Sequence, residues 1–451
     1  MFKNDMPDDI NSIPVDDIYK YVVDPPEYKG PSPKIRLNFV KMLYDVLDLQ
    51  LTSDAALCSI SMNQSLLALA TAGSGKTTLM QTKAILYKLI LDSRMRKNSK
   101  MLGKEILCLV YNHHNVADIQ SKHYQMVTKL RMANINGFDV DDEVSVKTMH
   151  SFCDGWSKQY VAKMGLVGFE LLKEEQSLNV MRRAINITYK KLKIQPIPSV
   201  TDKNMLSFYT LCKETCKTPD ELQNSDKFKD LKAPLDLIKT CFERYEIAKA
   251  SKRGYDFCDM LVKFYELIST DPKALATIQK SYSVIIADEV QDFTPIMWKI
   301  LKLLVSDNTI LNCIGDEDQS IYYFRGADIH ALLDFRDDFE NAKVYTLVHN
   351  RRCCGAILKE AKRVIEKNNL RFDKDLVGSK SGGLVELIPY STVEGQLQNV
   401  TEEMKKKTRN ERYDTVICFR ERSGSMLLAD LLEENDVPFN SLQGALPMQH
   451  E

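Results

Sequence analysis

Short apolar runs of strand length recur along the chain, and stretches with apolar residues at helical spacing separate them. The runs expected to form strands are residues 66–70, 105–111, 144–147, 284–287 and 309–314. Between them, the spacing of apolar positions predicts amphipathic helices, for example over residues 35–49 and 79–91. Strands that alternate with helices in this way indicate an α/β fold with a parallel sheet.

Residues 153–254 interrupt this alternation, because strand signals fade there and helical periods dominate. Basic clusters occur within the stretch, at Arg182-Arg183 and over residues 190–193. We interpret it as a helical subdomain inserted into a first α/β domain. That first domain would then be discontinuous in sequence and comprise residues 33–152 and 255–336.

The two ends of the chain have patterns of their own. Residues 1–32 are rich in Asp and Pro and predict a flexible leader. A second α/β unit is expected over residues 337–451, with helices between its strands. Those strands are expected near residues 343–348, 384–389 and 414–419.

Composition narrows the class of protein. Apolar residues make up 44% and charged residues 27% of the 451 residues, which is typical of a globular protein of two or three domains. The formal net charge is −1, so any contact with nucleic acid is expected from a local groove. No apolar run approaches the roughly 18 residues of a membrane span, and residues 1–9 lack the features of a signal peptide. We therefore expect a cytoplasmic protein, or a nuclear one in a eukaryotic host, that is not secreted and has no membrane partner.

Eleven cysteines are an odd number, and none forms a Cys-x-x-Cys pair. Cys58, Cys108, Cys313 and Cys418 lie within apolar runs and are predicted to be core thiols in a reducing compartment. No cysteine has a matching pair at ligand spacing, so we expect no cysteine metal site.

The strand over residues 66–70 leads through a loop of small residues to Lys76 and Thr77, which open a helical stretch. This is the layout of a phosphate-binding P-loop, whose backbone N–H groups point at phosphate oxygens. In that role Lys76 binds the β- and γ-phosphates and the Thr77 hydroxyl binds Mg²⁺. The strict pattern has Gly where this chain has Ala70, so a chance glycine-rich turn remains the alternative.

The strand over residues 284–287 ends in Asp288 and Glu289. In open α/β sheets ligands bind at the carboxyl ends of the strands. We expect Asp288 to be the Mg²⁺ partner, and Glu289 the base that orients and deprotonates the attacking water. An acidic surface turn is the alternative, but together with Lys76 these carboxylates predict an NTPase.

Polar and aromatic residues follow other strands as well. His150 comes after the strand at residues 144–147, and a hydrogen-bonded core histidine is an equal alternative for it. Gln319 follows the strand at residues 309–314 and is suited to sense a γ-phosphate. The aromatic and basic residues just beyond it suit a stacking surface, and they are Tyr322, Phe324 and Arg325. After residues 343–348 comes Asn350-Arg351-Arg352, where an arginine can reach across a domain cleft to the γ-phosphate.

In their order along the chain, these motifs resemble those of the UvrD/Rep-like branch of superfamily 1 helicases. The resemblance covers about residues 51–444 and is most specific over residues 315–327, with the string Gln-Ser-Ile-Tyr-x-aromatic-Arg-Gly-Ala. The first motif of that family itself begins with Ala, as at Ala70. The resemblance implies tandem RecA-like P-loop domains, the second one incomplete in this chain. It also implies an ATP-dependent motor that walks 3′-to-5′ on single-stranded DNA.

The resemblance assigns roles to individual residues. ATP would be bound by Ala70, Thr71, Ala72, Gly73, Ser74, Gly75, Lys76, Thr77, Thr78 and Arg351. Mg²⁺ would be bound by Thr77 and Asp288. The catalytic residues would be Lys76, Glu289, Gln319 and Arg352, the last as the γ-phosphate arginine. DNA would be contacted by Tyr111, Thr148, His150, Tyr322, Phe324 and Arg325.

Three positions depart from the family pattern. The adenine-reading Gln falls on Ala55, the arginine after the P-loop threonine is Thr78, and the tyrosine of the fourth motif is Arg351. An Arg351 guanidinium can still stack on adenine, but selectivity for ATP is left open. The chain also ends at Glu451, ahead of a second helical insertion and two further motifs of the family. One of those motifs carries a second arginine finger, and such a finger is worth ~10³–10⁵ in rate.

Three classes of function follow from these observations. The first is a DNA helicase or translocase motor that acts as a monomer on single-stranded DNA and its junctions with duplex. The second is a nucleotide-gated DNA-binding module that does not unwind, completed in some cases by a second chain that supplies the missing motifs. The third is a P-loop enzyme acting on small molecules, which leaves the string at residues 315–327 without a role.

Overall fold

The computed structural model describes residues 5–440, apart from residues 8–9, 26–27, 29, 64, 96–104, 134–143 and 375. The chain divides into two compact units, Met1–Gly383 and Leu384–Glu451.

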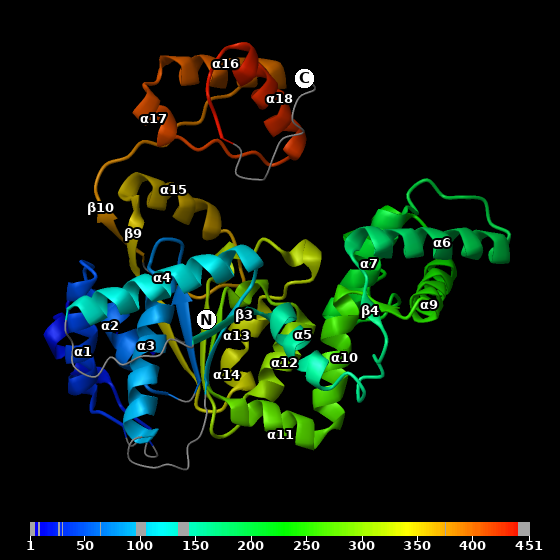
Figure 1. Ribbon diagram of the computed structural model, residues 1–451. Helices are drawn as coiled ribbons and strands as arrows, with labels where there is room; N and C mark the ends of the chain where they lie inside the picture. The colour runs from blue at the N-terminus through cyan, green and yellow to red at the C-terminus, as the bar shows by residue number, and fades with distance from the viewer. Residues whose placement is uncertain are drawn as a thin grey trace. The chain divides into compact units, whose positions relative to one another are not determined.

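A six-stranded parallel sheet forms the centre of the first unit (Figure 1). Its strands are β1 (Ser65–Ala70), β2 (Glu105–Val110), β3 (Val144–Thr148), β6 (Tyr282–Asp288), β7 (Ile310–Gly315) and β8 (Lys343–Leu347). They lie in the order β3-β2-β6-β7-β1-β8, and each neighbouring pair is parallel. Because the order places β6, β7 and β1 side by side, the loops that follow these three strands meet at one edge of the sheet.

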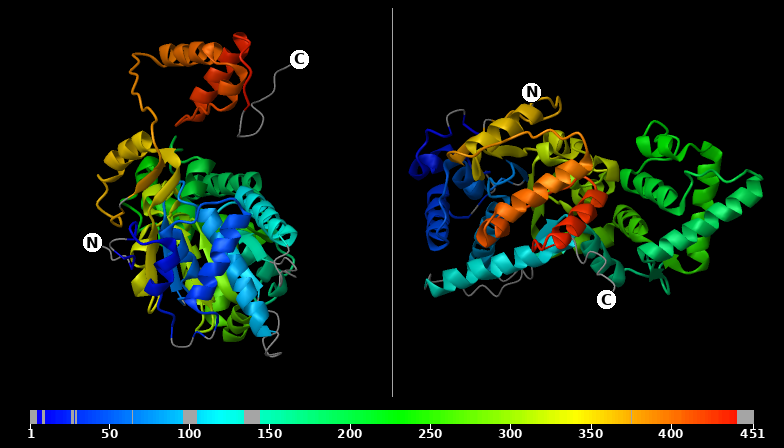
Figure 2. Two further views of the ribbon diagram at one scale, coloured as in Figure 1. Left: turned by 90° about the vertical axis from the view of Figure 1, so that its left-hand side faces the viewer. Right: turned by 90° about the horizontal axis from the view of Figure 1, so that it is seen from above.

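Helices cover both faces of this sheet (Figures 1 and 2). One face is covered by α1 (Pro33–Val46), α2 (Ser53–Ile60), α3 (Lys76–Met95) and α4 (His113–Met132). The other is covered by α5 (Met149–Gln159), α10 (Phe257–Thr270), α11 (Pro272–Ser281), α12 (Pro295–Leu304), α13 (His330–Leu333) and α14 (Phe335–Asp338). Burial on both faces explains why β1 and β6 read as continuous apolar runs rather than alternating ones.

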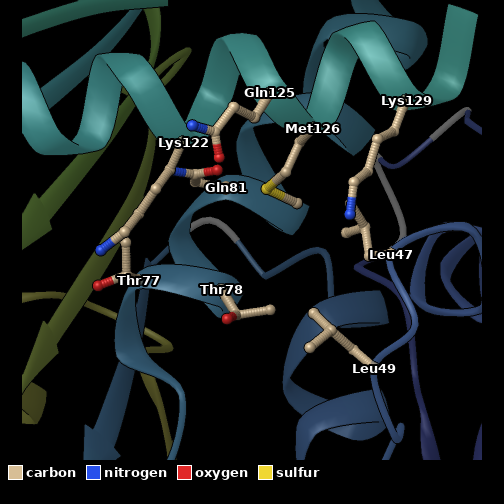
Figure 3. A pocket seen from close by; sticks show the side chains of 9 residues that line it. All are labelled: Leu47, Leu49, Thr77, Thr78, Gln81, Lys122, Gln125, Met126 and Lys129. Atoms are coloured by element: carbon tan, nitrogen blue, oxygen red, sulfur yellow. The ribbon is translucent and has the colours of Figure 1, made fainter. Parts of the chain in front are cut away.

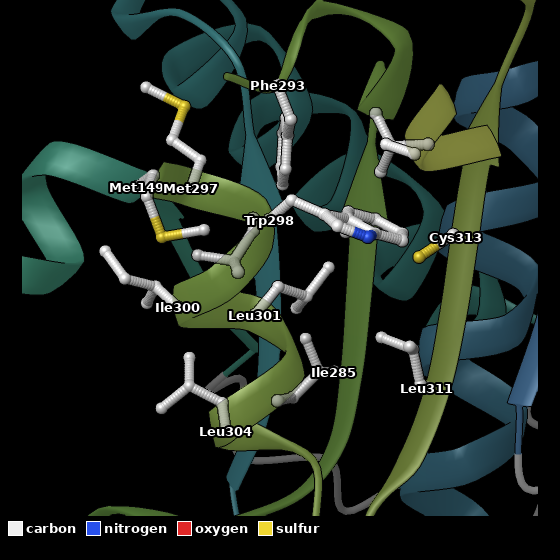
Figure 4. Packing of buried hydrophobic residues seen from close by; sticks show 14 of the residues in the cluster. Met149, Ile285, Phe293, Met297, Trp298, Ile300, Leu301, Leu304, Leu311 and Cys313 are labelled. Carbon is white, nitrogen blue, oxygen red and sulfur yellow. The ribbon is translucent and has the colours of Figure 1, made fainter. Parts of the chain in front are cut away.

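Helix α12 shows how sequence produces this packing. Thr294 precedes it and Pro295 occupies its first turn, where the missing N–H of proline costs no hydrogen bond. Its apolar residues recur at helical spacing and pack on Ile285 of β6 and on Leu311 and Cys313 of β7 (Figure 4). Each large apolar side chain buried in this way stabilises the fold by about 1.5–3 kcal/mol.

A separate helical core lies between β4 (Glu170–Leu171) and β5 (Gly254–Tyr255). It is formed by α6 (Glu174–Leu192), α7 (Asp202–Thr215), α8 (Asp226–Leu231) and α9 (Leu235–Ser251). Strands β4 and β5 pair in parallel, so the chain leaves and re-enters the α/β core at adjacent points. Lys249, which is 2% exposed, joins α9 to the start of α10 through ion pairs of 2.9 Å with Asp256 and 2.6 Å with Asp259.

The strand predicted at residues 343–348 was assigned to the wrong unit. It is β8, and it pairs with β1 from Leu66↔Lys343 to Ala70↔Leu347, so it completes the sheet that carries the P-loop. After it come β9 (His349–Cys354), α15 (Gly355–Ile365) and β10 (Val377–Lys380), with β9 and β10 paired in parallel. Sequence pattern identifies a strand but not the sheet that it joins, which explains the error.

The second unit is helical in its described part. It comprises α16 (Val393–Lys406), α17 (Arg409–Tyr413) and α18 (Arg422–Glu434), with a small core of Leu397, Leu428, Leu432 and Val437. The strands predicted at residues 384–389 and 414–419 are wrong, because neither segment forms a strand in the structure. Cys418 lies in the second segment and is exposed, contrary to prediction, whereas Cys58, Cys108 and Cys313 are buried as predicted.

The predicted flexible leader packs on the first unit in its described part. Residues 15–21 form the 3₁₀ helix η1 (Val15–Tyr21), and Ile10, Ile13 and Ile18 are buried in the core beside α1 and α2. The buried Arg36 guanidinium donates to Asp24 over 2.5 and 3.0 Å. The described part of the segment is therefore packed, and not loosely held as its Asp and Pro content predicts. The reason is that its scattered Ile residues anchor it in the core. Among the described helices, none has both the length and the apolar character needed to cross a membrane.

Candidate functional site

The loop after β1 has the backbone of a phosphate cradle. Gly73 and Gly75 have φ of 83° and 101°, in the left-handed region that glycine adopts without strain. Within the loop the Ser74 N–H and hydroxyl both donate to the Thr71 carbonyl, over 3.0 and 2.8 Å. Helix α3 then begins at Lys76, so Lys76 and Thr77 occupy the first turn, where backbone N–H groups are free to bind an anion.

Lys76 connects the ends of three neighbouring strands. Its Nζ lies 2.6 Å from Glu289 Oε2, just beyond β6, and 3.4 Å from Gln319 Oε1, beyond β7. Gln291 Nε2 donates to the same Glu289 oxygen over 2.8 Å, and Gln291 Oε1 accepts from the Asp316 N–H over 3.0 Å. Glu289 itself has φ of 52°, a strained conformation for a residue with a side chain. The predicted base, phosphate lysine and glutamine thus form one hydrogen-bonded group.

Asp288 and Thr77 provide the oxygen ligands that suit Mg²⁺. Asp288 is 4% exposed, and burial followed by the nearby Glu289 raises its pKa to about 7. Burial and Glu289 likewise raise the pKa of Asp292 to about 7, and Asp292 Oδ1 is buried without a hydrogen-bond partner among the described residues. Three carboxylates thus crowd around Lys76, and this local excess of negative charge fits a divalent cation.

Residues 350–352 of β9, which we call the arginine segment, are in direct contact with the P-loop. Asn350 Nδ2 donates to the Ala72 carbonyl, and the Arg351 N–H donates to the Gly73 carbonyl over 2.9 Å. The Asn350 Oδ1 atom accepts from the N–H groups of Arg352 and Cys353 over 3.0 and 2.8 Å, which fixes the turn of this segment. A Cβ on Gly73 would lie 2.5 Å from Arg352 Cβ, so the loop and the arginine segment are in close contact.

Arg351 and Arg352 differ in their surroundings. Arg351 Nη2 donates to Thr52 Oγ1 over 3.1 Å, on the side of α2 where the family pattern places the adenine-reading residue at Ala55. Ala55 is buried and has no side-chain donor. Arg352 is exposed beside the P-loop, as an arginine that meets a γ-phosphate would need to be.

A cavity of about 210 Å³ opens next to the P-loop helix (Figure 3). Thr77, Thr78 and Gln81 of α3 form one wall, and α4 forms another with Lys122, Gln125, Met126 and Lys129. Leu47 and Leu49 provide an apolar floor. Since Thr78 is short, no side chain from this position fills the cavity.

Four of the residues predicted to contact DNA form one aromatic cluster, which we call the stacking cluster: Tyr111, Tyr322, Phe324 and Arg325. The Tyr111 and Tyr322 rings are stacked, with 5.3 Å between their centroids and 29° between their planes. The centroid of the Phe324 ring lies 6.1 Å from that of Tyr322. The Arg325 guanidinium lies 5.1 Å from the Tyr322 ring and 5.7 Å from the Phe324 ring. Phe324 is 58% exposed, so its ring face is accessible to a base.

Thr148 and His150 lie outside the stacking cluster. Thr148 is buried, and its hydroxyl accepts from the Ser151 N–H over 3.1 Å, so that it caps α5. The His150 ring makes an edge contact of 6.2 Å with Phe257 of α10. This capping hydrogen bond is a structural reason for a threonine at position 148 that needs no contact with DNA.

Sequence reasoning missed Asp54 and Gln291 as supports of the site. Asp54 is 1% exposed, and its Oδ2 accepts from the N–H groups of Val348 and His349 over 2.7 and 3.0 Å, just before the arginine segment. Burial opposes ionisation of Asp54, but hydrogen bonds from His349 and Thr52 lower its pKa to about 2. Gln291 stands two residues after Glu289 in the same acidic string, and that spacing was the available signal.

The comparisons agree with this geometry. Residues 51–340 match the UvrD/REP helicase N-terminal domain, and the chain belongs to this family. The ATP-dependent DNA helicase PcrA of Staphylococcus epidermidis is 25% identical over 386 residues, which cover 84% of this chain and 49% of that protein. YjcD of Bacillus subtilis is 26% identical over 394 residues, covering 84% of this chain and 47% of its own. The chain spans about half the length of the curated relatives it matches.

Proposed function

We propose that this chain is the nucleotide-hydrolysing, DNA-contacting part of an ATP-dependent DNA helicase or translocase that moves 3′-to-5′ on single-stranded DNA. The observation that carries the proposal is the meeting of Lys76, Glu289 and Gln319 at three neighbouring strand ends. Three members of the stacking cluster, Tyr322, Phe324 and Arg325, follow Gln319 on the same loop. Membership of the UvrD/REP helicase family supports the proposal, and the PcrA relatives bear the name ATP-dependent DNA helicase.

ATP would place its phosphates on the loop at residues 71–75 and on Lys76. Thr77 and Asp288 would hold Mg²⁺, which neutralises charge on the β- and γ-phosphates. The cavity beside Thr77 and Thr78 would hold the nucleoside. Its apolar floor and polar walls suit a base and ribose, and the Arg351 guanidinium can stack on a base.

Hydrolysis would begin when the phosphates draw Lys76 away from Glu289. The freed Glu289 carboxylate accepts a proton from water as the water oxygen attacks the γ-phosphorus and ADP leaves. Gln319 orients the γ-phosphate, and the exposed Arg352 adds positive charge there. These roles fit a site in which Glu289 and Gln319 already share one lysine.

Single-stranded DNA would stack its bases on Phe324 and Tyr322, with Arg325 adding charge toward the backbone. Gln319 and Tyr322 lie on one short loop after β7, so a shift of Gln319 at the γ-phosphate can change the position of the aromatic rings. We propose this loop as the link between nucleotide and DNA.

The variant Glu289→Gln tests the proposed chemistry. We expect ATP hydrolysis to fall by about 10²–10⁴-fold, since the base is lost, while Mg·ATP binding is kept. Glu340→Gln is the matched control, because Glu340 is exposed just beyond α14 and the substitution removes the same charge. Unchanged turnover in Glu289→Gln, beside an active wild type, would remove Glu289 from the role of base.

A second candidate is a nucleotide-gated DNA-binding module that needs a further chain for unwinding. Apolar side chains exposed in the segments of the second unit outside its helices favour it, with Leu387 96% and Val416 71% exposed. Such side chains are typical of surfaces that another polypeptide covers. Duplex unwinding by this chain alone would exclude this candidate.

A further inference from the structure

Lys374 has no role in the site described so far, yet it is among the most deeply buried cations of the described chain. Its side chain is 0% exposed, and its Nζ lies 2.6 Å from Asp316, 2.8 Å from Glu317 and 2.8 Å from Asp318. Burial lowers the pKa of Lys374, but the three carboxylates more than offset this and raise it overall. The ammonium is therefore held charged by three consecutive carboxylates at the end of β7.

Arg371 and the backbone complete the same contact. Arg371 Nε and Nη2 donate to the two oxygens of Asp318 over 3.1 and 3.0 Å, which is a bidentate pair. The Phe372 N–H donates to Glu317 Oε1 over 2.9 Å, and the Phe372 ring is buried in the core that covers β6 and β7. We call residues 371–374 the clamp.

The three carboxylates form a group whose oxygens lie close enough together to hold a metal ion. Lys374 Nζ makes an ion pair with each of them, so it takes the place that a cation would occupy. The acidic group is thus a filled site, and a metal ion is not needed to balance it.

Asp316 connects the clamp to the nucleotide site. Its Oδ1 accepts from Lys374, while its Oδ2 accepts from Gln319 Nε2 over 2.5 Å. The other end of the Gln319 amide, Oε1, faces Lys76 Nζ at 3.4 Å. A single carboxylate therefore separates the buried lysine from the glutamine, and it fixes which end of the amide points at the phosphate lysine.

We propose that Lys374 is a positioning residue that holds Asp316, and through it the Gln319 amide, in the orientation that meets the γ-phosphate. Arg371 is a second positioning residue, which holds Asp318 beside the same Lys374 ammonium. The proposal rests on the proposed function. Residues 371–374 lie between α15 and β10, shortly before Gly383 ends the first unit, so the clamp also fastens the nucleotide site to the chain that leads into the second unit. A change in Gln319 on nucleotide binding then acts directly on that segment.

Arg371→Gln is the test variant, because it breaks the bidentate pair while the ammonium of Lys374 stays in place. Arg363→Gln is the matched control, since Arg363 on α15 is largely exposed and pairs only with Glu360 among the described residues. In steady-state ATP hydrolysis with single-stranded DNA, we expect Arg371→Gln to lower kcat about 10- to 100-fold with KM changed by less than about threefold. Arg363→Gln should match the wild type.

Hydrogen exchange with Mg²⁺ and ATPγS provides a readout that does not need turnover. In the wild type we expect ATPγS to protect amides of both the P-loop and residues 316–320. In Arg371→Gln, the P-loop should still be protected and residues 316–320 should not. If Arg371 had a purely structural role, the substitution would instead raise exchange of residues 316–320 equally with and without ATPγS. The protection that ATPγS gives to these residues would then stay intact.

The outcomes separate the two proposals. If Arg371→Gln retains wild-type kcat and wild-type protection of residues 316–320, the positioning role is wrong and the proposed function stands. If ATPγS protects neither region in the wild type, the proposed function itself is wrong, and the positioning role falls with it.

Discussion

Lys76 and Glu289 form an ion pair of 2.6 Å between the helix that follows β1 and the turn that follows β6. The pair joins the group that would bind phosphate to the group that would activate water. Each side chain is therefore held by the other in this structure. Binding of a nucleotide must exchange this carboxylate for phosphate oxygens on the lysine.

This exchange predicts that Glu289→Gln binds nucleotide at least as tightly as the wild type. The substitution removes the competing carboxylate and one negative charge near the γ-phosphate. Partly exposed ion pairs are worth up to about 1 kcal/mol, so we expect affinity to rise by up to about fivefold. Titration with a fluorescent ATP analogue measures the nucleotide affinity of the variant and of the wild type. Weaker binding would mean that Glu289 supports the nucleotide instead of competing with it.

The stacking cluster predicts a loss of DNA affinity in Phe324→Ala. Base–aromatic stacking is worth about 1–3 kcal/mol per base, so the dissociation constant for single-stranded DNA should rise about 5- to 150-fold. Tyr124→Ala is a suitable control, because Tyr124 is a 64% exposed aromatic residue on α4. Fluorescence anisotropy with labelled oligonucleotides gives both values. Equal losses in the two variants would show that the cluster has no special part in binding.

The close approach of the P-loop to β9 predicts different effects for two glycine substitutions. Gly73→Ala combines φ of 83° with a Cβ placed 2.5 Å from Arg352 Cβ, so we expect a loss of about 1–3 kcal/mol in stability and weakened ATP binding. Gly155 lies within α5 with open space around its Cβ position, so Gly155→Ala should be neutral or stabilising by up to about 1 kcal/mol. Thermal unfolding and ATP titration compare them. Normal ATP binding in Gly73→Ala would show that the close approach of the P-loop to β9 is not needed for nucleotide binding.

The lowered pKa of Asp54 predicts that part of the free energy of unfolding depends on pH. Its pKa is lowered to about 2 in the fold, so its contribution is fully present above pH ~4 and is lost as the pH falls toward 2. Asp54→Asn should therefore lower the free energy of unfolding by about 2 kcal/mol at pH 7, and by much less at pH 2.5. Urea unfolding at the two pH values measures the difference. A difference that does not change with pH would place the effect in packing rather than in the charge.

The sequence predicted the parts of the site that depend on local chemistry. The P-loop, the carboxylates after β6 and the stacking cluster follow strands whose apolar runs are unmistakable, and parallel strands bring their carboxyl ends together. It could not predict that residues 343–347 pair with β1, because the partner of a strand is set by contacts distant in sequence. Lys374 was missed for the same reason: a lone lysine after a helix carries no sign of the three carboxylates that surround it in the fold.

The proposed ATP-driven motor activity is best tested by steady-state ATP hydrolysis of the 451-residue chain, with and without single-stranded DNA and beside Lys76→Ala. For a DNA-dependent motor, we expect single-stranded DNA to stimulate hydrolysis many-fold and Lys76→Ala to abolish it. Hydrolysis that stays at the level of the Lys76→Ala control, with or without DNA, would contradict it.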